Sequence, residues 1–253
     1  MLAPCVLPDG KYIAIDRDGQ ILEKAKNRLM HYSHIDWFNE NYSSIQEILA
    51  RLEIQQIDRM IVDLGLSMFH LRIMERGFSF LSEEELDMRF NPADSPLSAF
   101  DVIHYFSESE ISDILYSFGE EKMARRIAKK IVDKRGEKPI KTCRDLAKLI
   151  ASVKGFSKGS HPATQSFQAL RIYVNAELHH LNLLLSQSHL IFSKGALMAF
   201  ITYHSIEDRI VKRFAIESPF FYMREKKPLT PSQEEISRNP AVRSAKLRVL
   251  VRS

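Results

Sequence analysis

Short runs of apolar residues in the first quarter of the chain have the length and continuity of buried β-strands. One run covers 11–15 and ends at Asp16, and a second covers 59–65 and contains Asp63. Between them we expect a helix at 21–30, a weak strand at 34–38, and a helix through Leu52 with Ser44 and Glu47 as its capping box. Apolar strands that alternate with helices predict a parallel, doubly wound α/β sheet.

The next convincing strand, 196–203, comes about 130 residues after Asp63, whereas a strand-helix-strand crossover needs only about 30 residues. We therefore predict a sheet domain made of residues 1–70 and 167–253 and a helical insert made of residues 71–166. The helices expected in and after the insert lie at 120–135, from the capping residue Thr142 onward, and from Phe167 through Leu185. The elements expected after the strand at 196–203 are a helix capped by Ser205 and Asp208 and a last strand at 246–252.

Composition and charge narrow the function only a little. The 36 lysines and arginines against 32 acids leave a net charge of +4, and the pI near 9.0 permits a nucleic-acid partner without establishing one. No apolar run is long enough to span a bilayer, and no secretory signal is visible. Cys5 and Cys143 match neither a zinc site nor a disulfide framework, which favours a cytoplasmic protein.

Polar residues that follow the strands are the candidates for chemistry, because ligands bind at the carboxyl ends of the strands in open α/β sheets. Asp16 is placed to accept the ribose hydroxyls of a nucleotide-like cofactor, although the segment 16–19 also has the composition of an ordinary turn. Asp63 is open to the same two interpretations, and His204 is either a buried, hydrogen-bonded histidine or a site residue. The residues after His204 expected to be helix caps and surface ions are Glu207, Asp208 and Arg209.

A cluster of cations marks the predicted helix at 120–135. Within residues 120–130 acids appear only at the start, and the cations that follow include Arg125, Arg126, Lys129 and Lys130. One interpretation is a solvated helix face, and the other is a surface that neutralises phosphates and releases their counterions. The residue pattern alone leaves both open.

Ordered sequence motifs extend the picture over nearly the whole chain. They are AIDRD (14–18), DLGLS (63–67), RGFSF (76–80), LDMR (86–89), GEE (119–121), HPAT (161–164), FQALRIYVN (167–175), HSIEDRIVKRF (204–214) and RSAKLR (243–248). Their order closely resembles the MraW/RsmH family, S-adenosylmethionine-dependent methyltransferases that modify N4 of a cytosine in the decoding region of small-subunit (16S) ribosomal RNA. The resemblance implies a class I methyltransferase with a Rossmann-like doubly wound sheet and a helical insert that helps to hold RNA.

The resemblance also assigns roles to particular residues. Asp16 is expected to bind the cofactor ribose, Tyr42 to lie against the adenine, and Asp63 to lie where the cofactor and the target base meet. His70 takes a cofactor-contacting position that is usually glutamine, in a segment, 67–72, that departs from the family pattern Ser-Ser-x-Gln-Leu-Asp. An imidazole still offers one hydrogen bond there.

The opening of the sequence is a second departure. Family members begin with a strand and a glycine-rich loop that cradles the methionine part of the cofactor, and this sequence is expected to start after that loop. The strands that end at Asp16 and Asp63 are then expected to lack the strand that separates them in a doubly wound sheet.

The resemblance implies transfer of a methyl group to an exocyclic amine, which needs a group to accept the amine proton and needs no metal. Asp63 is our first choice for that acceptor and His204 the second. The implied partners are small-subunit ribosomal RNA or the assembling small subunit, and homodimerisation is left open. The alternative function is a non-catalytic RNA-binding remnant, which the changed His70 segment favours and the intact Asp16 opposes. A nicotinamide-dependent dehydrogenase also places an acid after its second strand but has no counterpart to the motifs.

Overall fold

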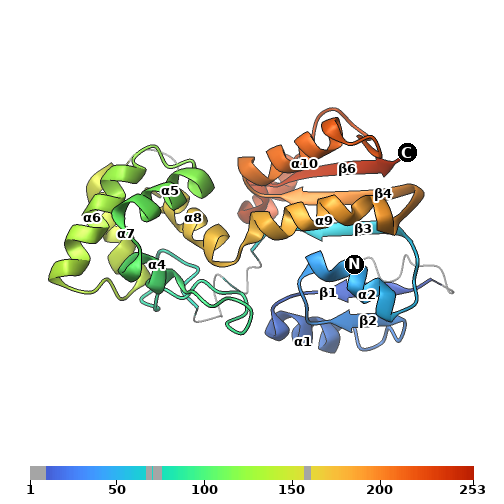
Figure 1. The fold of residues 1–253 in the computed structure, drawn as a ribbon, viewed down its shortest axis with the longest axis horizontal. Coiled ribbons are helices and arrows are strands. Elements are labelled where there is room, and N and C mark those ends of the chain that lie inside the picture. The colour runs from blue at the N-terminus through green and yellow to red at the C-terminus, as the bar shows by residue number, and fades with distance from the viewer. Residues whose placement is uncertain (1–9, 67–69, 71–75, 157–160) are drawn as a thin grey trace. The chain divides into compact units, whose positions relative to one another are not determined.

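A computed structural model of the chain describes residues 10–66, 70, 76–156 and 161–253 (Figure 1). The chain divides into two compact units. The sheet unit consists of the residues up to Gly65 and from Leu178 onward, and the helical unit consists of Leu66–Glu177. The helical unit therefore begins at Leu66, before the predicted start at residue 71, and ends at Glu177, after the predicted end at residue 166.

The strands of the sheet unit form two sheets. The strands β1 (Tyr12–Ile15) and β2 (Ile35–Phe38) pair in parallel. The other sheet has the order β3-β4-β6-β5 and consists of β3 (Ile57–Asp63), β4 (Phe192–Thr202), β6 (Lys246–Arg252) and β5 (Phe221–Met223). The pair β3–β4 is parallel, whereas β6 runs antiparallel to both of its neighbours. Strands alternate with helices, which confirms the predicted α/β, Rossmann-like class. The prediction that the sheet is parallel throughout is wrong, because β6 runs antiparallel to β4 and β5.

The strands that precede Asp16 and end at Asp63 are not paired with each other among the described residues. The strand β1 pairs only with β2, and β3 pairs only with β4. Apolar side chains still link the two sheets, because Ile13 and Ile15 of β1 pack against the same buried cluster as Val62 of β3. The two sheets therefore share one core although no backbone ladder joins them.

The sheet unit also contains α-helices and two short 3-10 helices, η2 and η3. They are α1 (Gly19–Arg28), η2 (Tyr42–Ser44), α2 (Ile45–Arg51), α9 (Glu177–Ile191), α10 (Ser205–Glu217), α11 (Gln233–Arg238) and η3 (Pro240–Ser244). The core side chains come mainly from α9 and β4, with Leu181, Leu184 and Leu185 against Met198 and Phe200. Apolar residues at helical spacing on α9 thus meet alternate residues of the strand.

The capping box predicted at Ser44 and Glu47 is wrong, although the helix it was meant to start is present. Ser44 is the last residue of η2, with φ −85° and ψ 12°, and its side chain makes no capping hydrogen bond to α2. A capping side chain needs extended backbone at that position. Asn41 has an extended backbone and caps η2, the short helix before α2, because its Oδ1 accepts a hydrogen bond from the Ser43 amide at 3.0 Å.

The helical unit contains α4 (Ala99–Tyr105), α5 (Glu108–Gly119), α6 (Ala124–Glu137), α7 (Cys143–Lys154) and α8 (Thr164–Val174). The predicted cap of α7 is confirmed, because Thr142 Oγ1 accepts a hydrogen bond from the Asp145 amide at 3.2 Å. The predicted start of the basic helix at 120 is wrong. Glu120 has a left-handed backbone with φ 52° and ends α5, so α6 begins only at Ala124.

The single long helix predicted from Phe167 through Leu185 is also wrong. The structure has α8 and α9 in its place, separated at Asn175 and Ala176, and Ala176 has a φ of +50°. Apolar periodicity continues across this break, but a left-handed residue cannot extend a right-handed helix. The break also ends the helical unit, so α8 belongs to that unit and nearly all of α9 to the sheet unit. Within the described residues, no helix is long and apolar enough to cross a membrane.

Candidate active site at the ends of β3 and β4

The parallel pairing of β3 with β4 brings the residues after both strands to one edge of the sheet. Asp63 pairs with Ile201 in the register, and the Leu64 amide donates a hydrogen bond to the Ile201 carbonyl at 3.0 Å. The chain continues from β4 into Tyr203 and His204 before α10 begins. Asp63 is exposed, and its Oδ1 accepts a hydrogen bond from the Gly65 amide at 3.0 Å. This edge therefore presents an accessible carboxylate where the sheet class binds ligands.

Tyr203 lies against the turn that follows β3, a contact that the sequence analysis missed. A Cβ atom built on Gly65 would lie 2.2 Å from Cε2 of the Tyr203 ring, so the ring fits there because residue 65 has no side chain. Burial, together with the negative charge of Asp63, raises the pKa of Tyr203 to about 12.

His204 is the N-cap of α10, so the prediction that Ser205 caps this helix is wrong. The His204 Nδ1 atom accepts a hydrogen bond from the Glu207 amide at 3.4 Å. Its Nε2 atom lies 3.1 Å from Glu207 Oε1, and both side chains are buried. A second oxygen of Glu207 accepts a hydrogen bond from the Tyr203 amide at 3.2 Å. The contacts of His204 are thus those of a helix cap, and its role as orienter or proton acceptor stays a prediction.

Asp208 is buried, and so is Glu207, which corrects the expectation that these residues are surface ions. The carboxylate of Asp208 lies 2.6 Å from Arg248 Nε on β6 and 3.2 Å from Lys246 Nζ. Burial disfavours the charged form, but hydrogen bonds from Arg248 and Lys246 outweigh that cost and hold the pKa of Asp208 below its ordinary value. This ion pair joins α10 to the sheet directly behind the candidate site.

The residues expected to bind the cofactor follow β1 and β2. Asp16 is half-buried, and its Oδ1 accepts a hydrogen bond from the Asp18 amide at 2.8 Å. This oxygen therefore stabilises the turn that the composition of residues 16–19 also indicated. Asn39, after β2, donates to the Asp16 carbonyl at 3.0 Å and so ties the ends of the two strands together. Tyr42 follows in η2 and packs, half-buried, against the core of the sheet unit. Asp16 and Tyr42 thus follow two paired strands, and their contact with a ribose and an adenine stays a prediction.

His70 lies in the helical unit and is buried there. Its ring packs on Phe78 at 5.2 Å and on Phe90 at 5.0 Å between centroids. The neighbouring residues 67–69 and 71–75 of the departing segment lie outside the described residues. The structure therefore shows aromatic packing for His70, and its contact with a cofactor stays a prediction.

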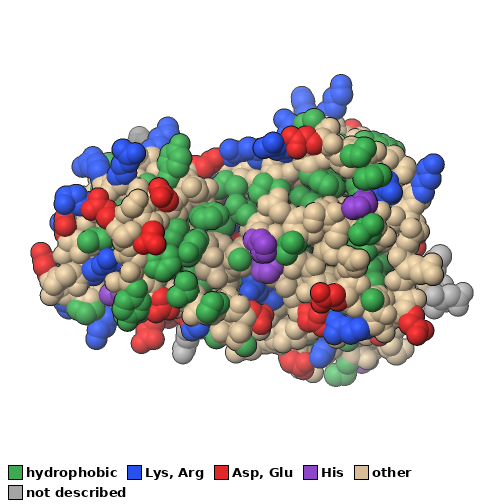
Figure 2. Space-filling view, in the orientation of Figure 1, with side chains coloured by type: hydrophobic (Ala, Val, Ile, Leu, Met, Phe, Trp, Pro, Cys, Tyr) green, Lys and Arg blue, Asp and Glu red, His purple; other side chains and the backbone are tan. Residues whose placement is uncertain are grey.

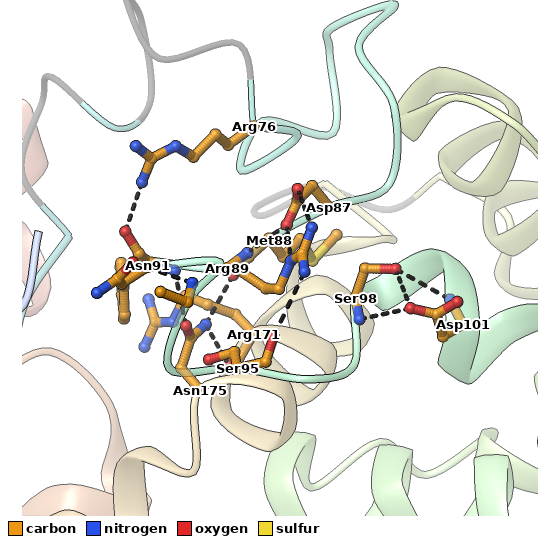
Figure 3. Close-up of polar contacts among 12 residues, drawn as sticks. Arg76, Asp87, Met88, Arg89, Asn91, Ser95, Ser98, Asp101, Arg171 and Asn175 are labelled. Carbon is orange, nitrogen blue, oxygen red and sulfur yellow. Dashed lines mark hydrogen bonds and ion pairs between the residues drawn. The ribbon is translucent and has the colours of Figure 1, made fainter.

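Two of the sequence motifs meet in the helical unit, where Figure 3 shows their polar contacts. Asp87 and Arg89 form a two-pronged ion pair, with Nε and Nη2 of Arg89 2.7 and 2.9 Å from the two carboxylate oxygens. Asn175, which follows α8, donates to the Met88 carbonyl at 2.7 Å and accepts from the Phe90 amide at 2.8 Å. Met88 is buried with a φ of +61°, a costly conformation for a residue with a side chain. These motif residues hold the loop against α8, a structural role that the sequence order did not reveal.

The four cations expected to contact RNA are all exposed on α6 of the helical unit. They are Arg125, Arg126, Lys129 and Lys130. Figure 2 shows lysine and arginine side chains interspersed with acidic ones over this unit, at the left of the view. The helix extends to Glu137 and includes Asp133, whose carboxylate lies 3.6 Å from the Lys129 ammonium group. The positive charge of this face is therefore balanced in part by acids, which residues 120–130 alone did not indicate. Among the described residues, Lys129 is the one member of the four that forms an ion pair.

Comparisons with known proteins agree with this architecture. The profile of the MraW methylase family matches residues 5–253. Proteins named "Ribosomal RNA small subunit methyltransferase H" match along most of the chain. The one from Dictyoglomus turgidum is 43% identical over 244 residues, which is 95% of this chain and 82% of the relative. The one from Coprothermobacter proteolyticus is 40% identical over 245 residues, with 96% of this chain and 82% of the relative covered. The chain therefore belongs to the MraW methylase family, whose class I methyltransferase fold uses S-adenosylmethionine as methyl donor.

Proposed function

We propose that this protein methylates N4 of a cytosine in the decoding region of small-subunit ribosomal RNA. The relatives' shared name supports the ribosomal substrate, and the ordered motifs support the cytosine position. The observation that carries the proposal is the exposed carboxylate of Asp63 at the carboxyl end of β3, beside the residues that follow β4. Asp63 is there to accept the proton that an exocyclic amine loses on methylation.

The test of this proposal is a methylation assay with labelled S-adenosylmethionine and small-subunit RNA or isolated subunits, followed by mass spectrometry of the digested RNA. The expected product is N4-methylcytosine at one position in the decoding region. Label at a different base would contradict the proposed specificity. The alternative, a non-catalytic RNA-binding remnant, predicts no saturable heat when the protein is titrated with S-adenosylmethionine.

The residues after β1 and β2 fit the nucleoside part of the cofactor. When bound, S-adenosylmethionine supplies the electrophilic methyl group. Asp16 supplies a carboxylate for the ribose hydroxyls. Tyr42 is half-buried against the core of the sheet unit and supplies an aromatic ring for the adenine. These two side chains bind and orient the cofactor and take no part in proton transfer.

Asp16→Ala is expected to weaken the binding of S-adenosylmethionine about tenfold to hundredfold. Hydrogen bonds to a charged group contribute about 1.5–3 kcal/mol, and Asp16 makes them in the ground state and the transition state alike. The loss is therefore one of uniform binding, so saturating cofactor should restore most of the turnover rate. Titration calorimetry measures the dissociation constant, and an unchanged value would exclude Asp16 from the cofactor site.

The basic face of α6 is proposed to contact the RNA backbone. Its exposed guanidinium and ammonium groups project from a helix whose opposite side is buried through Ile127, Ala128 and Ile131. That burial fixes the helix in the unit and leaves the cations directed to solvent. Phosphates attract such a face without base specificity.

The charge-reversed double variant Arg126→Glu/Lys130→Glu is expected to weaken RNA binding and reduce its salt dependence. Each lost phosphate contact lowers the slope of log Kd against log salt by about one unit. The matched control is Lys141→Glu/Lys148→Glu, which makes the same charge change at exposed positions before and on α7. Filter binding at several salt concentrations gives both slopes. Equal slopes for parent and α6 variant would mean that this face is merely solvated.

A further inference from the structure

We propose that His180 and Gln187 of α9 are positioning residues for the adenine of the cofactor, because they bind Ser43 and so fix the backbone that carries Tyr42. The inference rests on the proposed role of Tyr42 and extends it to residues that neither the motifs nor the relatives' names single out. All four residues lie in the sheet unit.

Ser43 of η2 forms hydrogen bonds through its amide, its hydroxyl and its carbonyl. The amide bond is the local one to Asn41 Oδ1, at 3.0 Å. The hydroxyl lies 3.0 Å from His180 Nδ1, and the carbonyl accepts a hydrogen bond from Gln187 Nε2 at 2.6 Å. These two bonds join η2 to a helix 137 and 144 positions further along the chain. Hydrogen bonds within a 3-10 helix have poor geometry, so the bonds to α9 contribute much of what holds η2 in place.

The helix that supplies these two side chains is itself fixed in the fold. His180 and Gln187 lie on one face of α9, about two turns apart. The same helix buries Leu181 and Leu185 in the core of the sheet unit. The groups that reach Ser43 therefore come from a packed element, which is the kind of support that a precise binding site needs.

The bonds at Ser43 act on Tyr42 through the backbone. Tyr42 directly precedes the serine, and its own carbonyl accepts a hydrogen bond from the amide of Ile45, which is buried. The direction of the tyrosine ring is thus set from both sides of its backbone. Stacking on an adenine depends on the relative orientation of the two rings, so a ring that must first be ordered binds more weakly.

Ser43→Ala and Gln187→Met each remove one bond between η2 and α9, so they are the direct tests. We expect the dissociation constant for S-adenosylmethionine, measured by titration calorimetry, to rise about threefold to tenfold in each variant, the usual effect of one hydrogen bond. The value of kcat at saturating cofactor and RNA should stay within about twofold of the parent, because the adenine is bound equally in the ground state and the transition state.

Substitutions of the two neighbouring histidines provide a rescue and a matched control. His180→Leu should weaken cofactor binding, whereas His180→Asn keeps a hydrogen-bonding group close to the serine and should retain the parental dissociation constant. His179→Leu makes the same change at the adjacent, exposed position of α9 and should also retain it.

A double-variant cycle with Tyr42 distinguishes positioning from a general loss of structure. Tyr42→Ala removes the ring, so adding Gln187→Met to it should weaken cofactor binding no further. Trp37 fluorescence, from the single tryptophan on β2 of the same unit, checks that each variant is folded.

The outcomes separate this inference from the proposed function. Parental dissociation constants for Ser43→Ala and Gln187→Met, beside weak binding by Tyr42→Ala, would overturn the positioning role and leave the role of Tyr42 intact. Additive effects of Gln187→Met and Tyr42→Ala would also overturn it, because Gln187 would then affect binding independently of the ring. A parental dissociation constant for Tyr42→Ala would overturn the adenine assignment and the inference with it.

Discussion

Asp63→Asn is expected to reduce kcat by about a hundredfold to ten-thousandfold, the usual contribution of a positioned general base. Asparagine has nearly the same shape as aspartate, and its amide oxygen still accepts the hydrogen bond from the Gly65 amide. It cannot accept a proton from the methylated amine. The dissociation constant for S-adenosylmethionine should change by less than about twofold, so the effect is one of turnover.

The matched control for this variant is Asp58→Asn. Asp58 lies on the same strand, β3, but near its other end, where its Oδ1 accepts a hydrogen bond from Ser193 at 2.8 Å. The same chemical change there should leave kcat at the parental value. Single-turnover methylation with saturating cofactor and RNA measures the chemical step directly. An Asp63→Asn protein that methylates at the parental rate under those conditions would show that Asp63 is not the base.

Apolar patterns located the described strands except the short strand β5, Phe221–Met223. Each predicted strand overlaps an observed one, and the last, Lys246–Arg252, agrees at both ends. The runs predicted strand conformation better than burial, because β1 has no fully buried residue and Ile61 of β3 is 51% exposed. The helix predicted from Phe167 through Leu185 failed because periodicity reports which residues are buried and carries no signal for a left-handed residue such as Ala176. Asn175 was the visible clue, since asparagine is common where helices end.

The candidate site was predictable only in part. Asp63 and His204 were singled out because they lie at the ends of strands, and parallel strands end at the same edge; their roles stay predictions. Tyr203 was missed because an aromatic residue at the end of an apolar strand is normally interpreted as a core residue. Its contact with Gly65 joins residues 138 positions apart (203 − 65 = 138), so no local spacing predicts it. Glu207 and Asp208 were misjudged for a similar reason, because burial of an acid depends on partners such as Arg248 that lie elsewhere in the chain.

Asp208→Ala is expected to destabilise the sheet unit by about 3–5 kcal/mol. The change removes the carboxylate that pairs with Arg248, whose side chain is only 6% exposed, and so leaves a guanidinium buried without its counter-charge. Total stabilities of domains are about 5–15 kcal/mol, so the loss is a large part of the whole. Urea denaturation followed by Trp37 fluorescence measures it, because Trp37 lies in the same unit.

The exposed ion pair at the other end of α10 provides the control for this prediction. Glu217 lies 2.7 Å from Arg213, and both side chains are more than half exposed. Glu217→Ala should therefore cost at most about 1 kcal/mol. The double variant Asp208→Ala/Arg248→Met also removes the buried, unpaired charge of Arg248. It should therefore recover part of the stability lost in Asp208→Ala. Equal destabilisation by Asp208→Ala and Glu217→Ala would show that burial of the pair has no energetic consequence.

The pH dependence of stability supplies an independent measure of the same pair. The pKa of Asp208 is lower in the folded protein than its ordinary value, so near pH 4 the unfolded chain binds more protons at this position than the folded one. The stabilisation by the pair is therefore complete above about pH 4 and is lost as the pH falls through the lower, folded pKa. Asp208→Ala has no such group, so the difference in unfolding free energy between parent and variant should shrink as the solution becomes more acidic. A difference that stays constant from neutral pH down to about pH 3 would mean that the charge on Asp208 does not stabilise the fold.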